Sequence, residues 1–169
     1  FTDNKSASTL LQADTQAGNW SNGVPTSTLN TSYFTSTANA GAVKHVRIDS
    51  ITEEHYEQIM GVNLKGVIFG VQKALPLMTR GGSIVVSTSI VGIAKSIPSL
   101  GIYSASKAGA RGFIRAMVPD LSARGIRINA LSPGSTETPI FENQFPSHEA
   151  AEMAREAANA LTPLKRIGT

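Results

Sequence analysis

The six residues "SIVVST" (Ser83–Thr88) decide the fold. They follow Gly81 and Gly82, which end a helical pattern, and they form a short apolar run rich in β-branched residues. Such a run, bounded by turn residues, is typical of a strand buried in a parallel sheet. The fold class therefore depends on whether the sequence on each side of this strand supplies helices and further strands.

A helical pattern precedes the strand. Apolar positions recur at helical spacing from "SITEEHYEQIM" through "VNLKGVIFGVQKALPLM" (residues 50–78), which predicts two consecutive helices or one broken helix. Ser50 and Glu53 form a capping box at the start, and Thr52 is a competing N-cap.

A second helical pattern follows the strand. After a loop with Pro98 and Gly101, the sequence predicts a helix from about Tyr103 to Ser122. Pro119 lies inside this helix, where proline forces a kink or an early end unless it is near the last turn.

Further strands complete the pattern. "RINALS" (Arg127–Ser132) is typical of another buried strand, and "SYFTST" (Ser32–Thr37) of a short one. A polar loop and a helix over "SHEAAEMAREAANAL", capped by Ser147, close the chain. Strands alternating with helices predict an α/β fold, a doubly wound parallel sheet with flanking helices of the Rossmann type, over residues 36–169.

Residues 1–35 differ in composition from the rest. They are close to half Ser, Thr and Asn and have no sustained apolar period, so we expect irregular structure. Asn4, Asn19 and Asn30 begin N-x-S patterns, but such patterns arise readily by chance in a stretch of this composition.

Composition excludes several classes of function. A chain of 169 residues with 41% apolar and 16% charged residues fits one globular domain. The net charge of +3 comes from scattered cations, so we expect no nucleic-acid partner. The absence of cysteine excludes thiol catalysis and fits a cytoplasmic protein, and no apolar run is long enough to predict a membrane span. His45, His55 and His148 are too dispersed to predict a metal site.

In a doubly wound sheet, ligands bind beyond the carboxyl ends of the strands. Three loops occupy that position: "ANAG" (38–41), "STSIVG" (87–92) and "SPGSTETP" (132–139). Each motif alone is weak, because "YSASK" (103–107) is also an ordinary helical turn and a serine after a strand is more often a turn residue than a catalytic one.

Taken in order, "ANAG", "VNLKG", "SIVVSTSIVG", "YSASK" and "RINALSPGSTETP" resemble the classical short-chain dehydrogenases/reductases. The resemblance runs from about Ala38 to Thr169. It implies an NAD(P)-dependent oxidoreductase that transfers a hydride between a nicotinamide cofactor, NAD or NADP, and a small-molecule ketone or secondary alcohol.

The resemblance also assigns catalytic roles by position. Tyr103 is the general acid/base, Lys107 its activator and a ribose ligand, Ser89 the residue that stabilises the substrate oxygen, and Asn63 the anchor of a proton-relay water. Ser87 competes with Ser89 for its role. A phenol has a reference pKa of about 10, so a lysine can activate it near neutral pH only in a desolvated pocket.

The resemblance further implies a set of cofactor-binding residues. Asn39 also has a purely structural alternative, which is to hold the sheet together. The expected cofactor contacts are Asn39, Ala40, Gly41, Tyr103, Lys107, Pro133, Gly134, Thr136 and Thr138.

The sequence departs from the family at both ends. No glycine-rich "TGxxxGxG" turn precedes "ANAG", no residue selects between NAD and NADP, and "PLKRIGT" leads into no last strand. We therefore expect a chain that lacks the first βαβ region and the last strand. Three hypotheses follow: an enzyme, a non-catalytic fragment or pseudo-enzyme that binds no cofactor, and, less favoured, a secreted binding module.

The resemblance also predicts a homo-oligomer, either a dimer or a tetramer. Its expected contact surfaces are the helices around Val62–Leu77 and Tyr103–Ser122. The alternative is that the apolar residues of these helices belong only to the core.

Overall fold

The computed structural model describes residues 41–79, 81–138, 141 and 144–168, together with the backbone of 20–21, 24–25 and 34–38. Three parallel strands form the central sheet in the order β3-β4-β5: β3 (Phe34–Ala38), β4 (Gly82–Ser87) and β5 (Ile126–Leu131). Phe34 pairs with Gly82, and Gly82 with Ile126, so the strands start level with one another. The predicted strand at residues 83–88 is therefore the centre of the sheet.

One continuous helical run connects β3 and β4. It comprises α2 (Glu53–Met60), a π-helical turn (Gly61–Lys65), α3 (Gly66–Ala74) and a 3-10 turn (Leu75–Leu77) containing Pro76. Of the two predicted caps, the capping box from Ser50 is wrong, because Ser50 ends a separate 3-10 turn (Ile48–Ser50). The hydroxyl of Thr52 accepts a hydrogen bond from His55 N instead.

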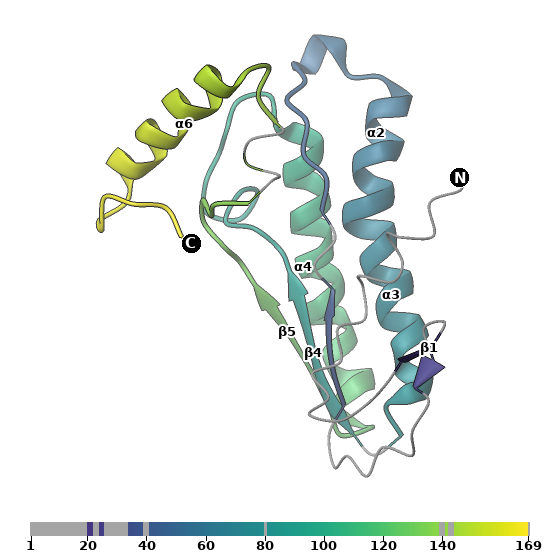
Figure 1. Ribbon diagram of the computed structural model, residues 1–169. Coiled ribbons are helices and arrows are strands. Elements are labelled where there is room, and N and C mark those ends of the chain that lie inside the picture. The colour runs from purple at the N-terminus through teal and green to yellow at the C-terminus, as the bar shows by residue number, and fades with distance from the viewer. Residues whose placement is uncertain are drawn as a thin grey trace.

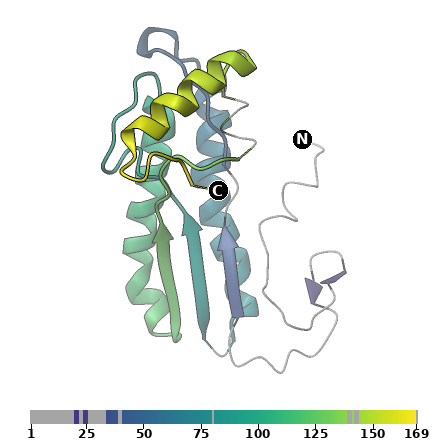
Figure 2. The same cartoon turned by 60° about the vertical axis from the view of Figure 1, so that its left-hand side comes forward.

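The helix α4 (Gly101–Ser122) connects β4 and β5, as predicted. Pro119 does not end it early, because the helix has only one further turn and the Pro119 carbonyl accepts bonds from Ala123 N and Ser122 Oγ. The last helix, α6 (His148–Leu161), begins at the expected cap, where Ser147 Oγ accepts from Ala150 N. It lies beyond the carboxyl ends of the strands (Figures 1 and 2).

The hydrophobic core lies between the sheet and the helices α3 and α4. Both helices pack on the same face of the sheet, as both views show (Figures 1 and 2). Along β4 and the first half of β5, burial alternates because successive side chains point to opposite faces. The buried members of the core cluster are Val67, Val71, Met78, Ile84, Val86, Ile114, Leu121, Ile126 and Ile128.

The opposite face of the sheet is more open within the described residues. Val85 is only half-buried, Arg127 and Asn129 are exposed, and 58% of Leu131 is exposed. The predicted α/β fold with a parallel sheet and flanking helices is confirmed, and the helices packed on the described sheet cover one of its two faces.

A short antiparallel pair, β1 (Trp20–Ser21) and β2 (Val24–Pro25), falls inside residues 1–35, where we expected irregular structure. The signal that the sequence offered is the dipeptide Asn22-Gly23 between them, which is typical of two-residue hairpin connections. The rest of that segment up to residue 33 lies outside the described residues.

Candidate active site

The loops after β4 and β5 are joined at the carboxyl edge of the sheet. Thr88 donates from both its backbone N (2.7 Å) and its Oγ1 (3.0 Å) to the carbonyl of Leu131. Ile90 N donates to the carbonyl of Pro133 at 3.1 Å. These bonds hold the predicted site loops 87–92 and 132–138 side by side.

Ser89 lies at the start of this joined region and is 8% exposed. Its Oγ accepts a hydrogen bond from Val91 N at 3.1 Å, which is the local geometry of a serine turn. A hydroxyl that accepts in this way keeps its own O–H as a donor. Ser89 can therefore close the turn and still donate to a substrate oxygen.

Tyr103 and Lys107 lie one turn apart near the start of α4. Lys107 is 4% exposed, its Nζ donates to the carbonyl of Ser87 at 3.1 Å, and Nζ lies 5.8 Å from the centroid of the Tyr103 ring. Burial lowers the pKa of the Lys107 ammonium, because the charged form loses hydration. Of the two competing serines, Ser87 thus contacts the lysine through its backbone carbonyl.

Asn63 occupies the centre of the π-helical turn and is completely buried. Its Oδ1 accepts from Ala42 N at 2.7 Å, and its Nδ2 donates to Ala42 O at 2.8 Å and to Ser106 Oγ at 3.1 Å. Ser106 Oγ in turn donates to the carbonyl of Tyr103 at 2.7 Å. The side chain of Asn63 therefore joins the segment after β3, its own helical run and α4.

The structure describes seven of the nine predicted cofactor residues, and they lie on different segments. Asn39 and Ala40 lie outside the described residues, whereas Gly41 is half-buried next to the residue that Asn63 holds. In the loop after β5, Thr136 pairs with Gly168, and Glu137 N donates to Gly168 O at 2.8 Å. Of the four predicted residues in this loop, all of them described, Pro133 alone forms a backbone hydrogen bond with the loop after β4, accepting from Ile90 N.

The loop after β5 is also tied to α6. Arg155 Nε donates to Glu137 Oε2 at 2.7 Å, and the Arg155 guanidinium also pairs with Glu152. This pairing lowers the pKa of the Glu137 carboxyl. Through Arg155, α6 is fastened to the loop that carries Gly134, Thr136 and Thr138.

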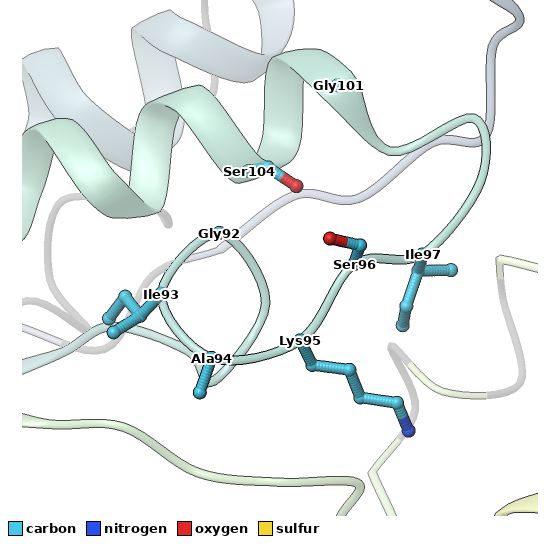
Figure 3. Close-up of a pocket in the computed structure, with 8 residues that line it drawn as sticks. All are labelled: Gly92, Ile93, Ala94, Lys95, Ser96, Ile97, Gly101 and Ser104. Atoms are coloured by element: carbon cyan, nitrogen blue, oxygen red, sulfur yellow. The ribbon is translucent and has the colours of Figure 1, made fainter.

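A cavity of about 320 Å³ lies beside the first turn of α4. In Figure 3 the hydroxyls of Ser96 and Ser104 face each other across it, while the Lys95 side chain runs away from α4. Gly92 forms one wall with φ of 85°, and a Cβ there would lie 2.5 Å from Ser104 O. The residues that line the cavity are Gly92, Ile93, Ala94, Lys95, Ser96, Ile97, Gly101 and Ser104.

Sequence reasoning missed Ser106 and Gly92, although both lie within motifs that it selected. Ser106 is three residues after Tyr103 and one before Lys107, so helical spacing places it near the face that carries both. Gly92 closes the motif "STSIVG", and only its positive φ distinguishes it from an ordinary loop glycine. No described helix is both long enough and apolar enough to cross a bilayer.

Comparison with known proteins supplies the family. The family model described as Enoyl-(Acyl carrier protein) reductase matches residues 33–169. The chain is 41% identical over 133 residues to "Oxidoreductase asL5" of Sarocladium schorii, covering 78% of this chain and 51% of that protein. It is 39% identical over 132 residues to "3-oxoacyl-[acyl-carrier-protein] reductase FabG" of Thermotoga maritima, covering 77% and 51%.

A third relative is "Diacetyl reductase [(S)-acetoin forming]" of Staphylococcus aureus, 37% identical over 108 residues, with 62% of this chain and 42% of that protein covered. The chain spans about half the length of the curated relatives it matches. The match over residues 33–169 and these relatives show that the chain belongs to the short-chain dehydrogenase/reductase family of oxidoreductases.

Proposed function

We propose that this chain provides the catalytic half of an NAD(P)-dependent oxidoreductase that interconverts a ketone and a secondary alcohol. The observation that carries the proposal is the buried Lys107, whose Nζ lies 5.8 Å from the ring of Tyr103 and donates to Ser87 O. Within the described part of the chain Lys107 has no carboxylate partner. Burying a lysine in this way lowers stability, and such residues are typical of catalytic sites.

The residues present fit the nicotinamide-ribose half of a dinucleotide. Lys107 Nζ has three N–H donors and uses one on Ser87 O, so two remain for ribose hydroxyls. Tyr103, Lys107 and the loop with Pro133, Gly134, Thr136 and Thr138 would hold this half. When bound, the nicotinamide would supply or accept the hydride.

The chain's own residues would handle the proton. In the direction of reduction, the carbonyl carbon gains a hydride and its oxygen becomes negative, so that oxygen needs a hydrogen-bond donor and then a proton. Ser89 Oγ–H would donate to the oxygen, and Tyr103 would transfer its phenolic proton to it, leaving an alcohol and a phenolate. The Lys107 ammonium would stabilise that phenolate, and a water anchored at Asn63 would return the proton.

A titration with NADH and NADPH, followed by nicotinamide fluorescence, tests the proposal. We expect saturable binding that Lys107→Ala weakens and that Lys73→Ala, which removes an exposed lysine of α3, leaves unchanged. Turnover is then followed by loss of nicotinamide absorbance with diacetyl as the probe ketone, and Tyr103→Phe should abolish it. A folded chain that binds neither nucleotide refutes the proposal and supports the non-catalytic alternative.

We also propose that the chain assembles with copies of itself through the helical run α2–α3 and α4. Val62 in the π-helical turn, Phe69 on α3 and Leu77 in the 3-10 turn are 38%, 49% and 38% exposed. Val118 on α4 is 46% exposed. Large apolar side chains exposed on neighbouring elements favour contact with another apolar surface.

A further inference from the structure

We propose that Ser106 is a positioning residue that holds Asn63 against the catalytic turn of α4. The inference rests on the proposed function, because it assigns Ser106 to the proton path of that reaction. Its basis is one chain of hydrogen bonds that links the backbone at Ala42 to Asn63, Asn63 to Ser106, and Ser106 to the carbonyl of Tyr103.

The direction of these bonds is fixed by the donors available. A serine hydroxyl has one hydrogen, and Ser106 uses it on Tyr103 O at 2.7 Å, so its oxygen must accept from Asn63 Nδ2. The other N–H of Asn63 goes to Ala42 O, and Oδ1 accepts from Ala42 N. The amide of Asn63 therefore has only one orientation that satisfies its three partners, Ala42 N, Ala42 O and Ser106 Oγ.

Burial makes this arrangement rigid. Asn63 and Ser106 both have 0% exposure, so no bulk water can replace a lost partner. Asn63 also lies in the π-helical turn, where Gly66 N donates to Gly61 O across five residues instead of four. Such single π turns are rare and are often found at functional sites.

Ser106 is well placed to act through Asn63 and not on the substrate. The Ser106 hydroxyl donates to Tyr103 O and accepts from Asn63 Nδ2, and the residue is completely buried. Ser106 is therefore not a hydrogen-bond donor to a bound ligand. What it fixes is the position of Asn63 relative to Lys107, the next residue on α4.

The test compares Ser106→Ala with Ser122→Ala. The two serines are matched because each donates to the carbonyl three residues earlier on α4, at 2.7 Å and 2.9 Å. Ser122, however, is exposed and lies at the far end of the helix. Ser106→Cys, which keeps a weak acceptor, should fall between Ser106→Ala and the wild type.

The first readout is independent of activity. Hydrogen exchange of the Asn63 side-chain amide, measured by NMR, should be slow in the wild type and in Ser122→Ala and faster in Ser106→Ala. The second readout is diacetyl reduction in H₂O and D₂O. We expect kcat of Ser106→Ala to fall about tenfold, part of the roughly 100- to 10,000-fold that a positioned proton-transfer group contributes, with KM unchanged.

The solvent isotope effect on kcat should rise in Ser106→Ala because proton delivery becomes slower than hydride transfer. Faster amide exchange without a change in kcat or in the isotope effect overturns the positioning role and leaves Ser106 structural. If the wild type shows a protected Asn63 amide and binds nucleotide but does not turn over, the proposed function itself is refuted. The positioning role of Ser106 in that reaction is then refuted as well. A folded Ser106→Cys with wild-type exchange and a lower kcat also contradicts the inference.

Discussion

Replacing Gly92 by alanine should destabilise the fold and disrupt the site together. Gly92 has φ of 85°, and a Cβ at this position would lie 2.5, 2.9 and 3.0 Å from Ser104 O, Cα and C. All three atoms belong to the backbone of α4 and cannot rotate away. The loop that carries Ser89 would have to move off the first turn of the helix that carries Tyr103.

The magnitude follows from two separate effects. A left-handed conformation costs an alanine about 1–2 kcal/mol relative to glycine. Forcing a methyl group into a packed contact costs typically about 1–3 kcal/mol. Together they predict a loss of roughly 2–5 kcal/mol in the free energy of unfolding for Gly92→Ala.

Urea unfolding followed by far-ultraviolet circular dichroism measures this loss. The matched control is Gly112→Ala, because Gly112 is an exposed residue in the middle of α4 where a Cβ would meet nothing within 4 Å. Since alanine is the better helix former, the control should gain up to about 1 kcal/mol. An unfolding free energy for Gly92→Ala within about 0.5 kcal/mol of the wild type, the range of neutral surface substitutions, would refute the reasoning.

Three further perturbations have definite expected outcomes. Lys107→Met should raise the free energy of unfolding at pH 7, because burial lowers the pKa of Lys107 in the folded state. The difference in unfolding free energy between variant and wild type should shrink as the pH rises towards the ordinary lysine pKa of about 10.4. Urea unfolding at pH 7 and at pH 10 measures both effects. Thr52→Ala should cost about 1 kcal/mol in thermal unfolding and Ser50→Ala far less, because only Thr52 caps α2; equal losses would contradict this. Phe69→Glu should lower the mass found by analytical ultracentrifugation, and an unchanged mass would exclude this face as the contact.

The main elements could be predicted because they depend on local pattern. β4, α4, β5 and α6 lie within about two residues of the ranges predicted from apolar spacing, prolines, glycines and the Ser147 cap. Ser50 failed as a cap because two residues competed for one helix start, and only the backbone path decides between them. β1 and β2 were missed because a two-residue strand leaves almost no periodicity.

The candidate site was predictable only in part, because burial and long-range contacts are not local properties. Tyr103 and Lys107 could be selected by spacing, but the burial of Lys107 depends on β4, whose Ser87 is 20 residues away. The π-helical turn has no sequence signature of its own. It coincides with contacts from Asn63 to residues 21 and 43 positions away, Ala42 and Ser106. The catalytic and cofactor roles of the selected residues stay predictions.

Because a π-helical turn joins α2 to α3, the number of residues in this helical run is itself constrained. A π turn contains one residue more than the α-helix needs to cover the same path, and each α-helical residue turns the chain by about 100°. Deleting one residue between Gly61 and Lys65 would therefore let the run continue as an α-helix, with α2 and α3 in the same relative rotation but without the π turn. His55 and Ile59 would stay buried, whereas Asn63 would lose its contacts with Ala42 and Ser106. In this run, homologous sequences should tolerate substitution more readily than a gap.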